Sequence, residues 1–92
     1  MFNFIRIARH LEQAAKCASE FRDEKLVASY LGKAEALGQK SRLNWNEVRA
    51  VISLYDRVIL AAADLNGTIP IREHCEELKS KYQSYMALNW PE

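Results

Sequence analysis

The chain has 92 residues and a net charge of +1, with 49% hydrophobic and 27% charged residues. This composition is ordinary for a globular protein and excludes a disordered or fibrous one. The length fits one domain, so we treat residues 1–92 as a single helical domain. A domain this short buries only about 60–65% of its unfolded surface, which favours pairing with a second copy or with a partner.

Basic charge is mildly concentrated in the first half of the chain. Residues 1–46 carry 8 basic and 5 acidic side chains, whereas residues 47–92 carry 5 and 7. Such a balance does not provide the broad positive field that drives non-specific nucleic-acid binding, although one local basic face remains compatible with it.

Nothing in the sequence suggests a membrane segment or a secreted scaffold. The longest apolar run, around residues 58–63, is too short to span a bilayer, and the first residues lack the pattern of a signal peptide. Two cysteines, Cys17 and Cys75, do not make a disulfide framework, so we expect both to be reduced and half-buried. We therefore expect a cytoplasmic protein with no membrane partner.

Apolar residues recur at spacings of three and four, which predicts helices rather than strands. The first stripe predicts a helix of about five turns and consists of Phe4, Ile7, Leu11, Ala14, Ala18 and Phe21. The stripe changes phase between Arg22 and Lys25, where we expect a turn with Asp23 as the cap of a second helix. Because no glycine or proline lies there, one long bent helix is the alternative.

The second helix is expected to end near Gly38, and residues 38–46 form the best candidate loop. Asn44 and Glu47 have the spacing of a capping box and predict the start of the third helix. Apolar residues cover most of the circumference of this helix between residues 48 and 65, so we expect it to be the central and most buried element.

Asn66 and Gly67 predict the end of the third helix, and Pro70 predicts the start of the fourth. The stripe of the fourth helix consists of Ile71, Cys75, Leu78, Tyr82 and Tyr85, and residues 89–92 are expected to be a frayed tail. Short connections favour antiparallel neighbours, so the predicted fold is all-α, a compact antiparallel bundle of four helices, or of three if the first two are one bent helix.

The residues that could carry chemistry lie in patterns that do not favour catalysis. The four potential metal ligands His10, Cys17, His74 and Cys75 lack the spacing that places helical ligands on one face, and both cysteines fall in or beside apolar stripes. Acidic pairs fall on outward helix faces, and no phosphate-binding glycine loop is present. We therefore expect a non-enzymatic protein with no catalytic residue, metal or cofactor.

Two basic groups could contact a phosphate backbone. One consists of Arg6, Arg9 and Lys16 in the first helix, and the other consists of Lys40, Arg42 and Arg49 near the aromatic Trp45. Clustered cations beside an aromatic ring suit nucleic acid. The alternative function is therefore a small nucleic-acid-binding protein that uses Arg6, Arg9, Lys16, Lys40 and Arg42.

Aromatic residues near chain ends and loops, Phe2, Trp45 and Trp90, either cap the bundle or anchor an interface. The apolar stripes contain more residues than the core of a four-helix bundle obviously needs to bury, which favours a helical contact surface. The preferred function is a non-enzymatic protein-interaction module: a small regulator, adaptor or inhibitor that covers a surface of a larger protein, with homodimerisation expected. The predicted partner-binding residues are Arg6, Arg9, Arg42 and Trp45.

Overall fold

The computed structural model describes residues 2–65, 67 and 69–91. They form four α-helices and one π-helical segment: α1 (Phe2–Lys16), η1 (Cys17–Phe21), α2 (Glu24–Lys40), α3 (Trp45–Ala61) and α4 (Ile71–Asn89). No strand occurs within these ranges. The predicted all-α bundle of four helices is confirmed, and the first two helices are separate rather than one bent helix.

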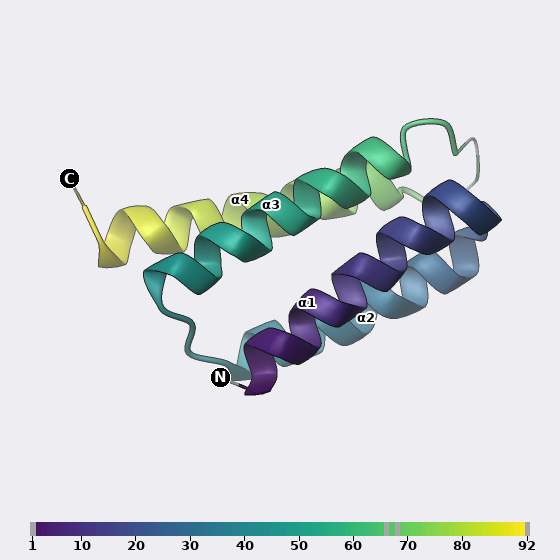
Figure 1. Ribbon diagram of the computed structural model, residues 1–92. Helices are drawn as coiled ribbons and strands as arrows, with labels where there is room; N and C mark the ends of the chain where they lie inside the picture. Colours follow the sequence, from purple (N-terminus) through teal and green to yellow (C-terminus); the bar gives the residue numbers. More distant parts are fainter. Residues whose placement is uncertain (1, 66, 68, 92) are drawn as a thin grey trace.

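The helices form two antiparallel hairpins, α1–α2 and α3–α4, which Figure 1 shows lying one against the other. The hairpins are held together mainly where α1 packs on α3, whereas α2 and α4 touch only briefly. The order around the bundle is therefore α2, α1, α3, α4. The contact between α4 and α2, which completes this arrangement, is small.

The apolar stripe was predicted to change phase between Arg22 and Lys25, and the structure has a turn there. The π-helical segment η1 directly precedes this turn. A π-helical turn takes in an extra residue, so it rotates the following side chains relative to an α-helical stripe. Arg22 then adopts a left-handed conformation (φ 49°), and the Asp23 carboxylate caps α2 by accepting from the Leu26 N–H at 3.1 Å. The prediction that Phe21 lies in the core is wrong, because this rotation leaves it 63% exposed.

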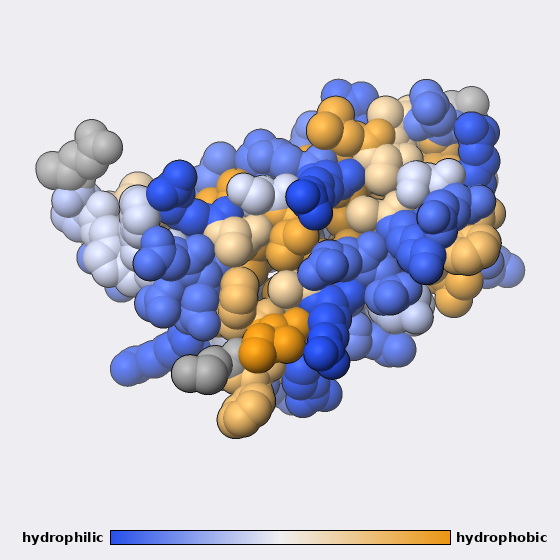
Figure 2. Space-filling view, in the orientation of Figure 1, coloured by the Kyte–Doolittle hydropathy of each residue, from blue (hydrophilic) through white to orange (hydrophobic). Residues whose placement is uncertain are grey.

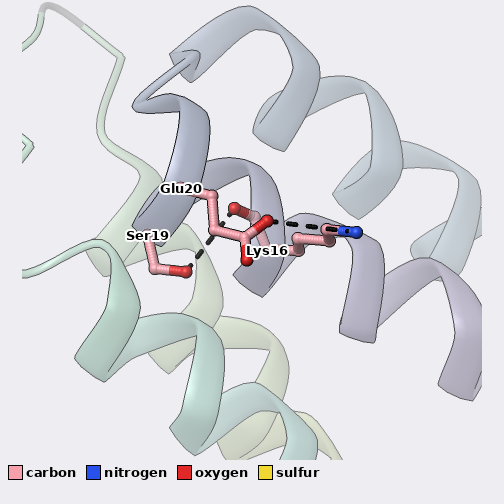
Figure 3. A network of polar contacts seen from close by, with 3 residues as sticks. All are labelled: Lys16, Ser19 and Glu20. Carbon is pink, nitrogen blue, oxygen red and sulfur yellow. Dashed lines mark hydrogen bonds and ion pairs between the residues drawn. The ribbon is translucent and has the colours of Figure 1, made fainter.

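Two residues of η1, Ser19 and Glu20, make polar contacts with Lys16 (Figure 3). The Ser19 hydroxyl donates to the Lys16 carbonyl at 3.5 Å, and Lys16 Nζ lies 3.9 Å from Glu20 Oε2. Both charged side chains are more than half exposed, so this pair contributes little to stability.

The capping box predicted at the start of the third helix is confirmed. The Glu47 N–H donates to Asn44 Oδ1 at 2.8 Å, and the Asn44 N–H donates to Glu47 Oε1 at 2.9 Å. The preceding loop is shorter than expected, residues 41–44 rather than 38–46, because α2 continues through Gly38 to Lys40.

The third helix is less central than its apolar sequence suggests. Its buried side chains are Val48, Val51, Tyr55 and Val58, yet Leu60 is 77% exposed. The inner position is shared with α1, which packs on both α2 and α3. The helix also ends earlier than predicted, at Ala61; Asn66 lies outside the described residues.

The fourth helix begins directly after Pro70, as predicted, and continues to Asn89. Asn89, the first residue of the expected frayed tail, is still helical, and the Trp90 N–H donates to the Met86 carbonyl at 2.9 Å while the Trp90 ring packs edge-on against Tyr85. Residues 90 and 91 lie beyond the helix, and Glu92 lies outside the described residues. In the part of the chain that the structure describes, no helix combines the length and apolarity needed to cross a membrane.

The core can be tested with one pair of leucines. Leu11 is completely buried and Leu60 is 77% exposed. We expect Leu11→Ala to lower the free energy of unfolding by about 2–5 kcal/mol, because it removes buried methyl groups and leaves a cavity. Leu60→Ala is the matched control and should change it by less than about 0.5 kcal/mol. Urea denaturation followed by circular dichroism measures both, and equal losses would contradict the described packing.

Candidate protein-interaction surface

The predicted contact residue Trp45 is the first residue of α3 and is 40% exposed. The Arg49 guanidinium lies 4.6 Å from the centre of its ring, which is a cation–π distance. Trp45 is therefore covered on one face by its own helix and presents only part of its ring to a partner.

The other three predicted contact residues are exposed, and of these only Arg42 lies near Trp45 in the chain. Arg6 and Arg9 belong to α1, and Arg42 belongs to the loop between α2 and α3. Within the described residues, none of the three arginines forms an ion pair or a side-chain hydrogen bond. The structure thus leaves three solvated cations on two different elements rather than one assembled cluster.

A strip of cations and rings crosses the outside of the α1–α2 hairpin. The His10 and Tyr30 rings lie 6.1 Å apart, and Lys33 Nζ lies 5.2 Å from the centre of the Tyr30 ring. The pKa of His10 is lowered by desolvation, and further by the nearby charges of Lys33 and Arg6. Arg6 therefore shares this strip, which the sequence analysis did not identify.

Figure 2 shows the face formed by α1 and α3. Hydrophilic side chains cover most of it, and apolar side chains are visible along the seam between the helices and around the first turn of α1. Phe2 is 79% exposed there and Ile5 41%. This face resembles an ordinary globular surface with a few scattered apolar residues.

A pocket of about 310 Å³ lies where α2 and α4 fail to close over α3. This α2–α4 pocket has apolar walls from Leu43, Val48 and Leu78, and three tyrosines, Tyr55, Tyr82 and Tyr85. Glu35, Gln39, Ser41 and Lys81 add polar atoms. The volume is at the lower end of the roughly 300–1,000 Å³ found for ligand pockets.

Tyr55 is one of the residues that line the α2–α4 pocket, and its hydroxyl is buried without a partner among the described residues. The side chain is completely buried, and its oxygen has no hydrogen-bond partner in the described part of the chain. Desolvation raises the pKa of Tyr55, and Tyr82, Cys75 and Glu35 add to the shift. A buried hydroxyl without a partner costs about 1–3 kcal/mol, which indicates that something other than stability keeps it there.

Glu35, which lines the pocket, forms a polar bridge from α2 to α4. His74 Nε2 on α4 lies 3.0 Å from Glu35 Oε1 on α2, and both side chains are half-buried. Next to this bridge, Tyr82 lies so close to Gly38 that a side chain at position 38 would overlap its hydroxyl. Gly38 thus remains inside α2 because Tyr82 packs against its backbone.

The last part of α4 is free of charge. Residues 82–91 contain no acidic or basic side chain, although 27% of the whole chain is charged. Tyr85 is 38% exposed, Leu88 83% and Trp90 38%. Tyr82 and Tyr85 belong to this uncharged segment and also line the α2–α4 pocket, and we call the pocket and the segment together the docking face. The sequence analysis singled out Trp90 but missed the uncharged run that contains it.

Both cysteines are buried and unpaired, deeper than the half-buried state expected from the sequence. Burial raises the pKa of the Cys75 thiol to about 12, and the charge of Glu76 adds to the shift. Within the described residues, no three His, Cys, Asp or Glu side chains are placed to hold a metal ion together.

Comparisons of the chain with protein-family models, curated proteins and solved structures find no significant match. What the chain does is therefore inferred from the docking face and the charged strip described above.

The buried thiol predicts a loss of stability at alkaline pH. Folded Cys75 keeps its proton up to about pH 12, whereas an unfolded thiol loses it above about pH 9. The free energy of unfolding should therefore fall as the pH rises from about 9 towards 12, and the raised pKa values of Tyr55 and Tyr82 add to this fall above about pH 10. Cys75→Ala should show a shallower fall in urea titrations at about pH 8 and about pH 10.5; parallel pH dependences in the two proteins would contradict this.

Removing the unpartnered hydroxyl should stabilise the fold. We expect Tyr55→Phe to raise the free energy of unfolding by about 1 kcal/mol, because a desolvated polar group disappears while the ring remains. Tyr85→Phe, in which the hydroxyl belongs to a 38% exposed residue, is the control and should change stability by less than about 0.5 kcal/mol. A clear loss of stability in Tyr55→Phe would show that the hydroxyl has a partner after all.

Proposed function

We propose that this chain is a non-enzymatic protein-interaction module that binds a larger protein through its docking face. The observation that carries the proposal is the uncharged segment 82–91, in which Tyr85 lines the α2–α4 pocket and Leu88 and Trp90 are exposed. Cores of protein interfaces are depleted of charge and enriched in Tyr, Trp and Met, and residues 82–91 have this composition.

The shape of the docking face suits a helix from the partner. The end of α4 presents aromatic and apolar side chains at helical spacing, and the adjoining pocket can accept one large side chain. An amphipathic helix lying along α4 would cover Tyr85 and Leu88 and insert an anchor between α2 and α4. Such buried anchors dominate the binding energy of interfaces.

The four residues predicted from the sequence divide between two surfaces. Arg42 directly precedes Leu43, which lines the pocket, and Trp45 follows Leu43 by two residues, so we assign both to the rim of the docking face. Arg6 and Arg9 lie on α1, which contributes nothing to the pocket among the described residues. These two arginines instead belong with the alternative function.

The alternative, a small nucleic-acid-binding protein, is supported by the strip on the α1–α2 hairpin. Cations there lie beside aromatic rings, with Lys33 over Tyr30 and Arg6 near His10. Cations interleaved with rings are what a phosphate backbone and an unstacked base require. We place this function second because the strip holds few charges and the net charge of the chain is only +1.

Capture of partners from a lysate of the source organism tests the proposal. The tagged chain should retain a discrete protein that survives nuclease and high salt, because an apolar interface is little screened. The double variant Leu88→Ala, Trp90→Ala should lose that protein by at least about tenfold, since interface anchors contribute about 2 kcal/mol or more. Leu60→Ala is the control and should retain the partner. Leu60 is about as exposed as Leu88, but it lies in the last turn of α3, away from the Trp45 end.

Three results would contradict the proposal. Equal capture by the double variant and by the control would exclude the docking face. Capture that disappears with nuclease or salt would favour the nucleic-acid alternative. A concentration-dependent dimer in light scattering that the double variant abolishes, with no other protein captured, would make the docking face a contact between two copies of the chain.

A further inference from the structure

The two ends of the bundle differ in charge. Figure 1 shows that α1 and α3 begin, and α2 and α4 end, at the same end of the molecule, which extends 38 Å along its longest axis. When each helix is divided near its midpoint, the half at this end comprises residues 2–11, 33–53 and 81–91, with 7 basic and 2 acidic side chains. The other half, residues 12–32 and 54–80, carries 6 basic and 9 acidic side chains. The first, which we call the basic half, thus has a formal net charge of +5 against −3 for the other.

The cations of the basic half are exposed and are not neutralised within the described chain. They are Arg6, Arg9, Lys33, Lys40, Arg42, Arg49 and Lys81. None of these seven side chains forms an ion pair with a described residue, whereas Lys16, Arg72 and Lys79 of the other half each pair with a carboxylate. The two halves therefore differ in how their charges are compensated as well as in net charge.

The two acidic side chains of the basic half already have partners. Glu35 Oε1 lies 3.0 Å from His74 Nε2, and Glu47 Oε1 accepts from the Asn44 N–H at 2.9 Å within the capping box. Neither carboxylate forms an ion pair with a cation of the basic half among the described residues. The excess positive charge of this half is thus directed at solvent.

The docking face lies in the basic half. The uncharged segment 82–91 belongs to it, as do all the residues that line the α2–α4 pocket except Tyr55 and Leu78. Two cations stand at the edge of the pocket, because Lys81 lines it and Arg42 lies between two residues that line it. An apolar surface edged by cations is complemented by apolar contact residues that are flanked by carboxylates, since opposite charge steers association and selects the partner.

We propose that the partner segment that binds the docking face is an acidic amphipathic helix, apolar on the side that meets α4 and rich in Asp and Glu along its flanks. This inference rests on the proposed function, because it specifies the chemistry of the segment that the docking face binds. A nucleic acid would match the charge, but it offers mainly phosphate and sugar contacts. Such contacts do not cover an aliphatic side chain like that of Leu88, which is 83% exposed.

Two synthetic helical peptides test this inference. Both carry leucine at positions i, i+3, i+4 and i+7, and the remaining positions are glutamate in one peptide and lysine in the other. In fluorescence anisotropy at low salt, the glutamate peptide should bind at least about tenfold more tightly, and added salt should reduce this advantage because ions screen the charges. The Leu88→Ala, Trp90→Ala variant should lose the glutamate peptide, which would place its binding on the docking face.

Charge reversal at the two ends of the bundle provides matched variants. Arg42→Glu, Lys81→Glu should weaken binding of the glutamate peptide by about tenfold or more, because two attractive charges become repulsive. Lys25→Glu, Arg57→Glu changes the net charge equally in the other half and should bind within about twofold of the original chain, since salt screens distant charges. All four side chains are exposed and form no ion pair with a described residue, so both variants should fold.

Several results would overturn the inference. Equal binding of the two peptides, binding of neither, or equal losses in the two charge-reversed variants would each do so. Binding of a single-stranded oligonucleotide or of phosphatidylglycerol vesicles that is tighter than binding of the glutamate peptide, and unchanged in Leu88→Ala, Trp90→Ala, would assign the basic half to a nucleic acid or to an anionic membrane. The proposed function fails by a different result, the retention of the captured partner by the Leu88→Ala, Trp90→Ala variant.

Discussion

The packing of α1 against α3 is the contact on which the rest of the structure depends, since it provides most of what joins the two hairpins. Ile7 and Leu11 on α1 and Val48 and Val51 on α3 are completely buried in one continuous core. Burying each such side chain contributes about 1.5–3 kcal/mol. The contact between α1 and α3 therefore fixes how the two hairpins lie relative to each other. The outer helices α2 and α4 are positioned by their packing on α1 and α3, respectively.

The loose closure between α2 and α4 follows from that arrangement. With α1 and α3 in the inner positions, α2 and α4 are in contact over only a short stretch. The pocket between them is lined by three tyrosines together with Leu43, Val48 and Leu78. Gly38 admits the Tyr82 ring, and the Glu35–His74 contact joins the two outer helices across the opening. The pocket is thus a consequence of how the hairpins pack, and the polar residues that line it distinguish it from a simple packing defect.

Two features near the α2–α4 pocket are unfavourable for the isolated chain. An orphaned hydroxyl at Tyr55 weakens a small domain that has little stability to spare, and an uncharged helix end weakens solubility. A partner that covered the end of α4, as the proposed function requires, would remove its exposed apolar side chains from water. Violations of the usual folding rules that cluster on one surface are typical of functional sites.

The sequence by itself determined the helices, their caps and the core stripes. The Asn44–Glu47 box, the Asp23 cap and the break near Arg22 depend on contacts between residues a few positions apart, so spacing alone predicts them. Only the tertiary structure decided which residues at the ends of the apolar stripes are buried. The exposure of Phe21 accompanies a π-helical turn without an evident local signal, and Tyr85 is 38% exposed although it belongs to the apolar stripe of the fourth helix. The pocket joins residues of α2, α3 and α4 that lie far apart in the chain, and periodicity carries no information about which helices meet or how closely they pack.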